Sequence, residues 1–370
     1  MERPRHLTLF LCGDVMTGRG IDQVLPHPSR PRLYEPAVSS AFDYVDLAER
    51  KNGPIPWPVA FGYVWGAALD VLDEVRPHAR IVNLETAITT SETPAFKPIH
   101  YRMHPANVPV LTAAGIDACV LSNNHVLDWG EAGLLDTLEA LDRAGIRVAG
   151  AGRDRAAARA PAVIDTAAGA RVLVFGLGAT DSGIPGSWAA GRGWPGVHVV
   201  PDFSDAVVAA VARLVASARR AGDVVVASIH WGGNWGYDIP PEHRRFAHAL
   251  IDGAGIDVVH GHSSHHVKAI EVYRGCPIFY GCGDFLTDYE GIEGYGEFRD
   301  DLVLMYFPTI DLATGHLARL RMTPLRLRNF RLNPPSPADR AWLRATLVRE
   351  CGRFGHRVVE RDGALELAWE

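Results

Sequence analysis

Residues Val258–Asp284 read VVHGHSSHHVKAIEVYRGCPIFYGCGD, and the interpretation of the whole chain starts from this stretch. Two β-branched residues predict the end of a buried strand, which breaks at Gly261 among the histidines at positions 260, 262, 265 and 266. Two apolar runs, Val267–Tyr273 and Pro277–Cys282, follow with a glycine-containing turn between them and predict a hairpin. Neutral histidine is the commonest nitrogen ligand of metals in proteins. The stretch predicts a metal site at a strand end; the alternative is a solvated loop or a set of hydrogen-bonded core histidines.

The composition is that of an ordinary globular protein of 370 residues, with 47% hydrophobic and 22% charged residues. A formal net charge of −6 argues against a nucleic-acid-binding protein. The five cysteines are dispersed and form no CxxC pair, so we expect them in the core. The N-terminal apolar run is too short for a signal peptide, and no stretch has the length of a membrane span. We therefore expect a cytoplasmic protein without a membrane partner.

The order of the predicted elements alternates between strand and helix, which is typical of an α/β fold. Buried strands are predicted at 7–12, 79–84, 117–121, 223–229 and 258–262, and helices at 131–144, 204–221 and 241–253. Residues 301–311 and 317–329 read as an antiparallel pair, and 337–355 as a helix before a charged tail. Residues 26–58 are rich in proline and predict a long irregular loop that acts as a lid. We expect a catalytic domain over residues 1–330, with 26–60 as an insertion or lid, and a C-terminal helix and tail over 331–370.

Five of the predicted strands end in polar loops, which read GDVM, NLE, SNNH, IHWGGNW and HGHSSHH. Ligands in open α/β sheets bind beyond the carboxyl ends of the strands, so these loops are expected to converge. The candidate metal ligands are Asp14, Glu85, Asn124, His230, His262 and His265. Carboxylate, amide and imidazole donors suit Ca²⁺, Mn²⁺, Mg²⁺ or Zn²⁺, and the absence of cysteine from the loops argues against a structural zinc.

These loops carry a resemblance to a known family. GDVMTGR, NLETAIT, SNNHVLDWGEAGLLDTLEALDRAGI, HWGGNWGY and GHSSHHVKAIEVYRGCPIFYGCGDF resemble the successive motifs of the CapA-like family, named for poly-γ-glutamate capsule synthesis. That family is a branch of the calcineurin-like metallophosphoesterases, and the resemblance spans about residues 7–290. It implies a four-layer α-β-β-α sandwich of two mixed sheets with a metal site at the strand ends. By the same resemblance, Asp14 begins the first metal site, Glu85 bridges, Asn124 and His125 supply a ligand and a general acid, and His230, His262 and His265 complete the site.

The resemblance fails at one position. The wider superfamily has Asp-x-His in its first motif, whereas this chain has Asp14-Val15-Met16. A thioether does not replace an imidazole on a hard cation. One strongly held divalent ion is therefore expected rather than two, and no organic cofactor is expected.

Two histidine–carboxylate pairs are the candidate catalytic groups: His125 with Asp128, and His265 with Asp284. Each carboxylate would orient its imidazole for acid or base chemistry; Asp128 could instead cap the following helix. The candidate substrate-binding residues are Arg19, which would hold a substrate carboxylate, and Trp129, Trp231 and Trp235, which flank the loops. For each of these four, a surface or packing role is the alternative.

Three functions compete. The favoured one is epimerisation at a Cα of a peptide, as the resemblance implies for CapA-like enzymes of lasso-peptide clusters; the substrate would be a ribosomal precursor peptide, with a leader-peptide-binding protein as a further partner. The second is hydrolysis or transfer at a γ-glutamyl amide or phosphoester. Capsule-associated members of the family carry a membrane tether, and the lack of one here, together with Met16, favours the first. The third is a binding module with a structural metal, which the density of acid–base groups disfavours.

Overall fold

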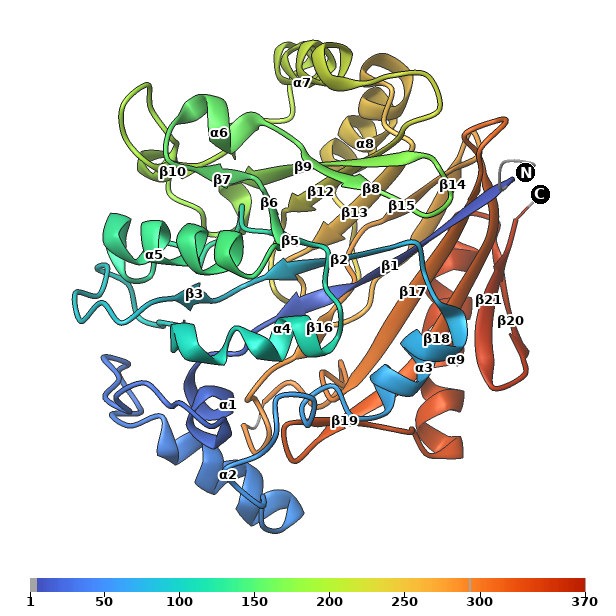
Figure 1. Ribbon diagram of the computed structural model, residues 1–370. Coiled ribbons are helices and arrows are strands. Elements are labelled where there is room, and N and C mark those ends of the chain that lie inside the picture. The colour runs from blue at the N-terminus through green and yellow to red at the C-terminus, as the bar shows by residue number, and fades with distance from the viewer. Residues whose placement is uncertain (1–4, 293, 370) are drawn as a thin grey trace.

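The computed structural model describes residues 5–292 and 294–369. Most of the described strands fall into two mixed sheets with helices on their outer faces (Figure 1). The larger sheet has the order β20 (Arg357–Arg361), β21 (Ala364–Ala368), β18 (Leu317–Arg328), β17 (Leu302–Asp311), β1 (His6–Val15), β2 (Ala79–Leu84), β5 (Ala118–Val120) and β6 (Arg147–Ala149). In addition, β16 (Asp284–Leu286) pairs with β1 and β19 (Arg331–Asn333) pairs with β18. Strands β1, β2, β5 and β6 are parallel, and the strands from β17 to β21 are antiparallel to their neighbours.

The smaller sheet has the order β11 (Val199–Val200), β9 (Arg171–Ala179), β12 (Val224–His230), β13 (Val258–His262), β15 (Cys276–Phe279) and β14 (Ile270–Tyr273), and β8 (Ala162–Asp165) pairs with β9. Strands β11, β9, β12, β13 and β15 are parallel, whereas β14 and β8 run antiparallel to their partners. Two short ladders complete the pairing: β3 (Ala87–Ile88) with β4 (Arg102–Met103), and β7 (Ala151–Gly152) with β10 (Gly196–Val197). The predicted hairpin after the histidines is confirmed as β14 and β15.

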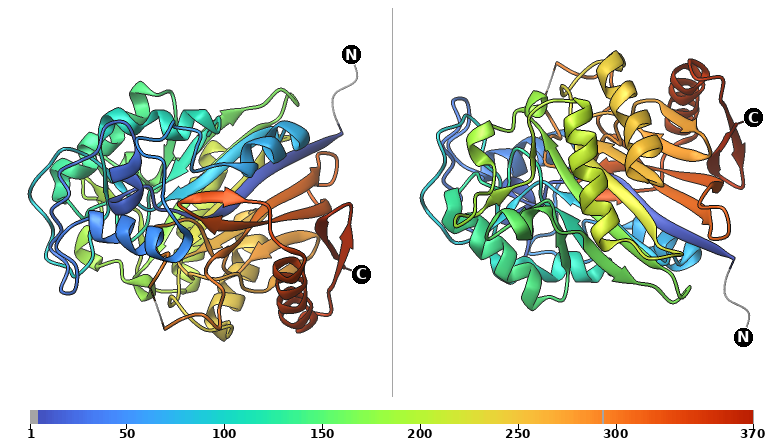
Figure 2. Two further views of the ribbon diagram at one scale, coloured as in Figure 1. Left: turned by 90° about the horizontal axis from the view of Figure 1, so that it is seen from below. Right: turned by 90° about the horizontal axis from the view of Figure 1, so that it is seen from above.

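The helices cover the outer faces of the two sheets. They are α1 (Arg19–Val24), α2 (Phe42–Asn52), α3 (Ala67–Val75), α4 (Pro109–Ala113), α5 (Gly130–Arg143), α6 (Arg155–Arg159), α7 (Asp205–Ala218), α8 (Pro241–Ala254) and α9 (Pro337–Gly352). Seen from above, α7 and α8 lie across the smaller sheet, and seen from below, α1 and α2 lie on the opposite side of the molecule (Figure 2). No helix in the described part of the chain combines the length and the apolar character that a membrane crossing requires.

The alternation of side chains along the strands produces the layers. In β1, Leu7, Leu9 and Leu11 join a buried cluster with valines of β9 and β12, between the two sheets. Phe10 and Cys12 of the same strand point to the other face, into a cluster with the helices of the larger sheet. The outward residues of β9 and β12 pack with α7 and α8 in a third cluster. Because successive residues of a strand face opposite sides, one strand serves two cores. The predicted sandwich of two mixed sheets flanked by helices is confirmed.

Two of the secondary-structure predictions were wrong. The segment expected to be irregular contains α2, because a run without proline over residues 42–52 buries Tyr44, Val45 and Ala48. The expected charged tail forms the hairpin β20–β21, in which Val358, Leu365 and Leu367 are buried. Its turn, at Asp362-Gly363, has positive φ at both residues, as a tight hairpin turn requires. The division into a domain over 1–330 and an extension over 331–370 remains a prediction.

Candidate metal centre

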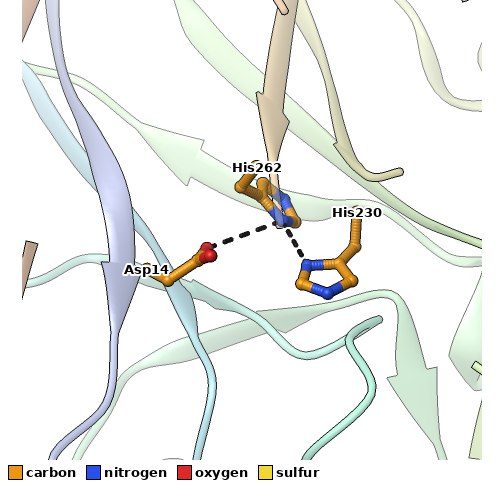
Figure 3. A group of neighbouring side chains, drawn as sticks. All are labelled: Asp14, His230 and His262. Carbon is orange, nitrogen blue, oxygen red and sulfur yellow. Dashed lines mark hydrogen bonds and ion pairs between the residues drawn. The ribbon is translucent and has the colours of Figure 1, made fainter. Parts of the chain in front are cut away.

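Three side chains from three strand ends form a compact buried group. Asp14 lies near the end of β1, and His230 and His262 are the last residues of the parallel partners β12 and β13. Asp14, His230 and His262 offer ligand atoms that all lie within 4.8 Å of one another, and all three side chains are buried (Figure 3). The Nδ1 atoms of the two imidazoles are 2.9 Å apart, and His262 Nδ1 is 3.9 Å from Asp14 Oδ1. This set is called the Asp14 group below.

Glu85 borders the Asp14 group and is held there by asparagines. Its Oε2 atom lies 4.0 Å from His230 Nδ1. The amide of Asn83 donates to Asp14 Oδ1 at 2.7 Å and to Glu85 Oε2 at 3.2 Å. Asn123 in turn donates to Asn83 Oδ1 at 3.0 Å. The sequence reasoning missed Asn83 and Asn123, although both stand inside the quoted loops NLE and SNNH, next to predicted ligands.

Several buried side-chain oxygen atoms have no hydrogen-bond partner within residues 5–292 and 294–369, and two of them belong to residues that the sequence predicted for the site. These two are Asn124 Oδ1 and Asp284 Oδ2. An unpartnered buried acceptor is costly, so its persistence requires a donor or a cation that the protein chain does not supply. Asn124 was predicted as a ligand, and its free oxygen is consistent with that role.

The surroundings of the carboxylates in this group disfavour their charged form and favour a neighbouring cation. Burial, with the neighbouring Asp284, raises the pKa of Asp14 to about 7, and burial, with Asp14, raises the pKa of Glu85 far above its usual range. Burial lowers the pKa of both His230 and His262, so these imidazoles are neutral and able to ligate. Carboxylates crowded in a low-dielectric site are stabilised in their charged form by a bound cation. The donor set therefore fits a divalent metal ion, as the sequence predicted, while the identity of the metal remains open.

His125 lies beside the Asp14 group as one of the two predicted histidine–carboxylate pairs. Its Nδ1 atom is 2.7 Å from Asp128 Oδ2, and its Nε2 atom is 3.8 Å from Glu85 Oε1. Burial lowers the pKa of His125 to about 4. Asp128 is fully buried and also accepts from the backbone N–H of Tyr101. It precedes α5 and makes no cap contact, because that helix has no side-chain cap.

Lys97 is a member of the site that sequence reasoning missed. Its ammonium group donates to Asp128 Oδ1 at 2.6 Å and lies 3.2 Å from His125 Nδ1. It also donates to the backbone carbonyl of Asn124. The segment between β3 and β4 shows no motif, and the one available signal was the rarity of lysine in a chain whose basic residues are mostly arginine.

The second predicted pair also forms. His265 Nδ1 lies 2.8 Å from Asp284 Oδ1, and this partner raises the pKa of His265 against the opposing effect of burial. The structure thus pairs His265 with Asp284 and leaves it outside the compact Asp14 group; its role as a ligand remains a prediction. The Trp235 ring lies 5.3 Å from the His265 ring and stacks on Tyr295 at 4.0 Å. Of the four predicted substrate-binding residues, Trp235 has a half-buried ring beside the site.

The other three candidates for substrate binding are fixed in packing or ion pairs. Arg19 is 3% exposed, and its guanidinium is paired with Glu35 and Asp288. Trp129 is buried under the guanidinium of Arg102. Trp231 is buried, stacks on His243 and donates its indole N–H to the carbonyl of Tyr280. Each of the three already has partners inside the protein, and their role in substrate binding remains a prediction.

Met16 stands where the superfamily pattern implied by the sequence has a histidine. Its side chain is fully buried, and its sulfur lies 3.6 Å from the hydroxyl of Tyr289. The Tyr289 hydroxyl also accepts from the Tyr101 hydroxyl at 2.7 Å. The thioether of Met16 and the phenols of Tyr289 and Tyr101 therefore lie where the superfamily pattern would place an imidazole ligand.

Comparison with known proteins assigns the chain to a family. Residues 8–289 match the family described as bacterial capsule synthesis protein PGA_cap. The chain belongs to this family. The match covers the strand ends from β1 to β16, which include every residue of the Asp14 group. The expected membership in the CapA-like family is confirmed, whereas nothing in the comparison singles out the lasso-peptide branch.

Curated relatives extend over almost the whole chain. A protein of Mycobacterium tuberculosis (strain ATCC 25618 / H37Rv), named a probable polyglutamine synthesis accessory protein, is 50% identical over 98% of this chain and 96% of its own. The PGA biosynthesis protein CapA of Bacillus subtilis (strain 168) is 27% identical over 93% of this chain and 77% of its own. Among solved structures, a novel phosphatase from Mycoplasma pneumoniae overlaps with a TM-score of 0.47 at 11% identity, over 89% of this chain and 95% of that one.

Proposed function

We propose that the chain is a metal-dependent enzyme that hydrolyses or transfers a γ-glutamyl amide. The observation that carries the proposal is the position of His125, whose imidazole is held by Asp128 and points Nε2 toward Glu85 at the edge of the Asp14 group. A positioned acid–base group next to a set of metal donors is the arrangement that amide cleavage needs. The names of two relatives, a probable polyglutamine synthesis accessory protein and a PGA biosynthesis protein, support polymers of glutamate or glutamine as the substrate class.

The chain's own residues supply the proton transfers. Asp128 accepts the Nδ1–H of His125, so the lone pair of the neutral ring is on Nε2. Because the pKa of His125 is low, the ring is neutral at pH 7 and accepts a proton from water as the water oxygen bonds to the amide carbonyl carbon. When the C–N bond breaks, the same ring returns that proton to the leaving nitrogen. A divalent cation held by Asp14, His230 and His262, with Glu85 and Asn124 at its side, would polarise the carbonyl. In transfer, an amine takes the place of the water.

A second function is favoured by a separate observation, the second pair of His265 with Asp284. Two imidazoles, each oriented by its own carboxylate, can remove a Cα proton from one face and deliver a proton to the other. This is epimerisation of a peptide, with a ribosomal lasso-type precursor as the substrate and a leader-peptide-binding protein as a partner. It ranks second because the relatives' names point to glutamyl polymers.

One incubation separates the two reactions. The metal-loaded protein is incubated in D₂O with γ-glutamyl oligomers of defined length and, separately, with α-linked peptides, and the products are followed by mass spectrometry. Shortened or extended γ-glutamyl chains without deuterium at Cα support cleavage or transfer. Deuterium gain in an intact peptide supports epimerisation and overturns the favoured function.

The His125→Ala variant tests the residue that carries the proposal. It should keep its metal and its fold while losing about 10²-fold or more of the rate, which is the usual contribution of a positioned acid or base. The loss should be smaller for a nitrophenyl ester, because nitrophenolate leaves as a stable anion and needs no proton to depart. The matched control is His316→Ala, which removes an exposed histidine far along the chain. A fully active His125→Ala enzyme would remove His125 from the mechanism.

A further inference from the structure

A groove of about 580 Å³ lies between α6, α7 and the loop before β10, outside the candidate metal centre. Its basic lining residues are Arg155, Arg159 and Arg192, and all three are exposed. Phe175 and Leu214 form part of the apolar wall. In Figure 1, α6 lies beside β7 and β10, and this places the groove next to that short ladder.

Within residues 5–292 and 294–369, the three guanidinium groups have no acidic partner. In the part of the chain that the structure describes, ion pairs join Arg143, Arg171 and Arg219 to carboxylates, but none involves the arginines of the groove. The one carboxylate in the lining, Asp154, is occupied as the cap of α6, where it accepts from the backbone N–H of Ala157 at 2.8 Å. Three arginines and one aspartate leave a local excess of two positive charges on a protein with a formal charge of −6, and this excess attracts anions to the groove.

One loop connects the groove to the candidate metal centre. Ser182, at the start of this loop, donates its hydroxyl to the carbonyl of His230 at 3.1 Å. The ring of Trp188 lies 5.6 Å from the ammonium group of Lys97, which itself contacts His125. Arg192 follows Trp188 by four residues, so their Cα atoms are at most about 14 Å apart. The backbone N–H of Arg155 donates to the carbonyl of Gly191 at 2.7 Å, which fixes α6 to the same loop.

We propose that Arg155, Arg159 and Arg192 bind the carboxylates of an extended anionic chain whose reacting amide lies at the metal centre. This inference rests on the proposed function and adds the place where its substrate binds, since a γ-linked glutamate polymer carries one free carboxylate on each residue. Guanidinium groups bind carboxylates through two parallel hydrogen bonds, so a row of them holds a polycarboxylate without reading its sequence. The groove would select long substrates over short ones, because only a long chain occupies both sites at once.

Binding is measured separately from chemistry. The variant Arg155→Ala/Arg159→Ala/Arg192→Ala is titrated calorimetrically with poly-γ-glutamate of defined length, next to wild type. The matched control is Arg245→Ala/Arg344→Ala/Arg357→Ala, which removes the same charge from exposed arginines elsewhere. The groove variant should bind about tenfold or more weakly, the sum expected for three exposed ion pairs. The control variant should bind like wild type, and the difference should vanish near about 1 M salt, where charges are screened within about 3 Å.

The outcomes separate this inference from the proposed function. Equal affinity of the groove and control variants for poly-γ-glutamate overturns the groove, whatever the enzyme does to an amide. Wild-type binding of uncharged poly-γ-glutamine with the same affinity also overturns it. If wild type cleaves no γ-glutamyl amide but its binding of poly-γ-glutamate still depends on the three arginines, the proposed binding site is supported and the proposed reaction is wrong. If the groove variant cleaves the amide with an unchanged KM for every chain length, the proposed reaction is supported and the proposed binding site is wrong.

Discussion

The ammonium group of Lys97 lies 2.6 Å from the carboxylate of Asp128, and this ion pair ties the segment between β3 and β4 to the candidate metal centre. The Asp128 carboxylate is fully buried, whereas the Lys97 side chain is 18% exposed. A buried carboxylate shared between a lysine and the His125 ring is held in its charged form, and its pKa is lowered by both partners against the effect of burial. Lys97 thus keeps Asp128 able to orient His125.

Lys97→Met should lower kcat by about tenfold while leaving the bound metal unchanged. The substitution keeps an unbranched side chain one atom shorter but removes the charge that stabilises Asp128, so His125 loses part of its orientation. Steady-state kinetics with a γ-glutamyl substrate and elemental analysis of the same preparation are the measurements. Lys51→Met, at an exposed position, is the control. Wild-type kcat in Lys97→Met would show that Asp128 needs no cation.

The Asp14 group should hold about one divalent ion per chain after purification, because its two neutral imidazoles and its carboxylate form one compact set of donors. Elemental mass spectrometry of wild type and of His230→Ala/His262→Ala measures this. The double variant should lose the ion. A variant with His6→Ala and His316→Ala, both exposed, should retain it. Unchanged metal content in His230→Ala/His262→Ala would place the ion elsewhere.

The layers of the fold could be predicted because strand and helix patterns are local. Strand β1 alternates residues for two cores, and β12 and β13 end in the histidines that the sequence marks as a break. The hairpin β20–β21 was missed because its buried Val358 and Leu367 stand among charged residues, and the Asp362-Gly363 turn was not read as a signal. Helix α2 was missed because the prolines on both sides of it predict irregular structure, and its amphipathic run is short.

The site could be predicted only as far as its motifs reach. His230 and His262 end neighbouring parallel strands, so their convergence follows from topology, whereas Asp14 reaches them from β1 of the facing sheet. Lys97 comes from an irregular segment, and no sequence rule brings it to Asp128. Arg19 was predicted to hold a substrate carboxylate because it is a conspicuous cation near a motif, and no signal in the sequence indicates that Glu35 and Asp288 surround it.

Asp288→Asn should destabilise the protein by about 3 kcal/mol, the lower end of the cost of breaking a buried ion pair. Asp288 is fully buried and accepts from Arg19 Nε at 3.2 Å and from the backbone N–H of Gly20 at 2.8 Å. The midpoint of urea unfolding should fall with an unchanged slope. Glu139→Gln removes an exposed partner of Arg143 and should change stability by less than about 0.5 kcal/mol. If Asp288→Asn is as stable as wild type but binds substrate more weakly, Arg19 binds substrate rather than stabilising the fold.

His198 should make the stability of the protein depend on pH at a place away from the metal centre. Its ring is 8% exposed and donates from Nδ1 to the carbonyl of Gly176 at 3.1 Å. Burial, with a smaller effect of Arg159, lowers the pKa of His198 to about 4, against about 6.5 in an unfolded chain. Between these values the unfolded state binds the proton more readily. The contribution of neutral His198 to the free energy of unfolding is therefore fully present above about pH 6.5. It is lost as the pH decreases toward 4, and the loss approaches about 3 kcal/mol.

The variant His198→Asn isolates this contribution, because the amide can still donate to Gly176 but does not titrate. Urea unfolding of both proteins, in chelator to keep the metal centre empty, gives the free energy of unfolding at pH 7 and at pH 4. Other buried histidines, such as His260, titrate in both proteins and cancel in the comparison. Wild type should lose about 3 kcal/mol more than His198→Asn between the two pH values. If the free energies of unfolding of the two proteins change with pH in the same way, burial does not disfavour protonation of His198, and the prediction is wrong.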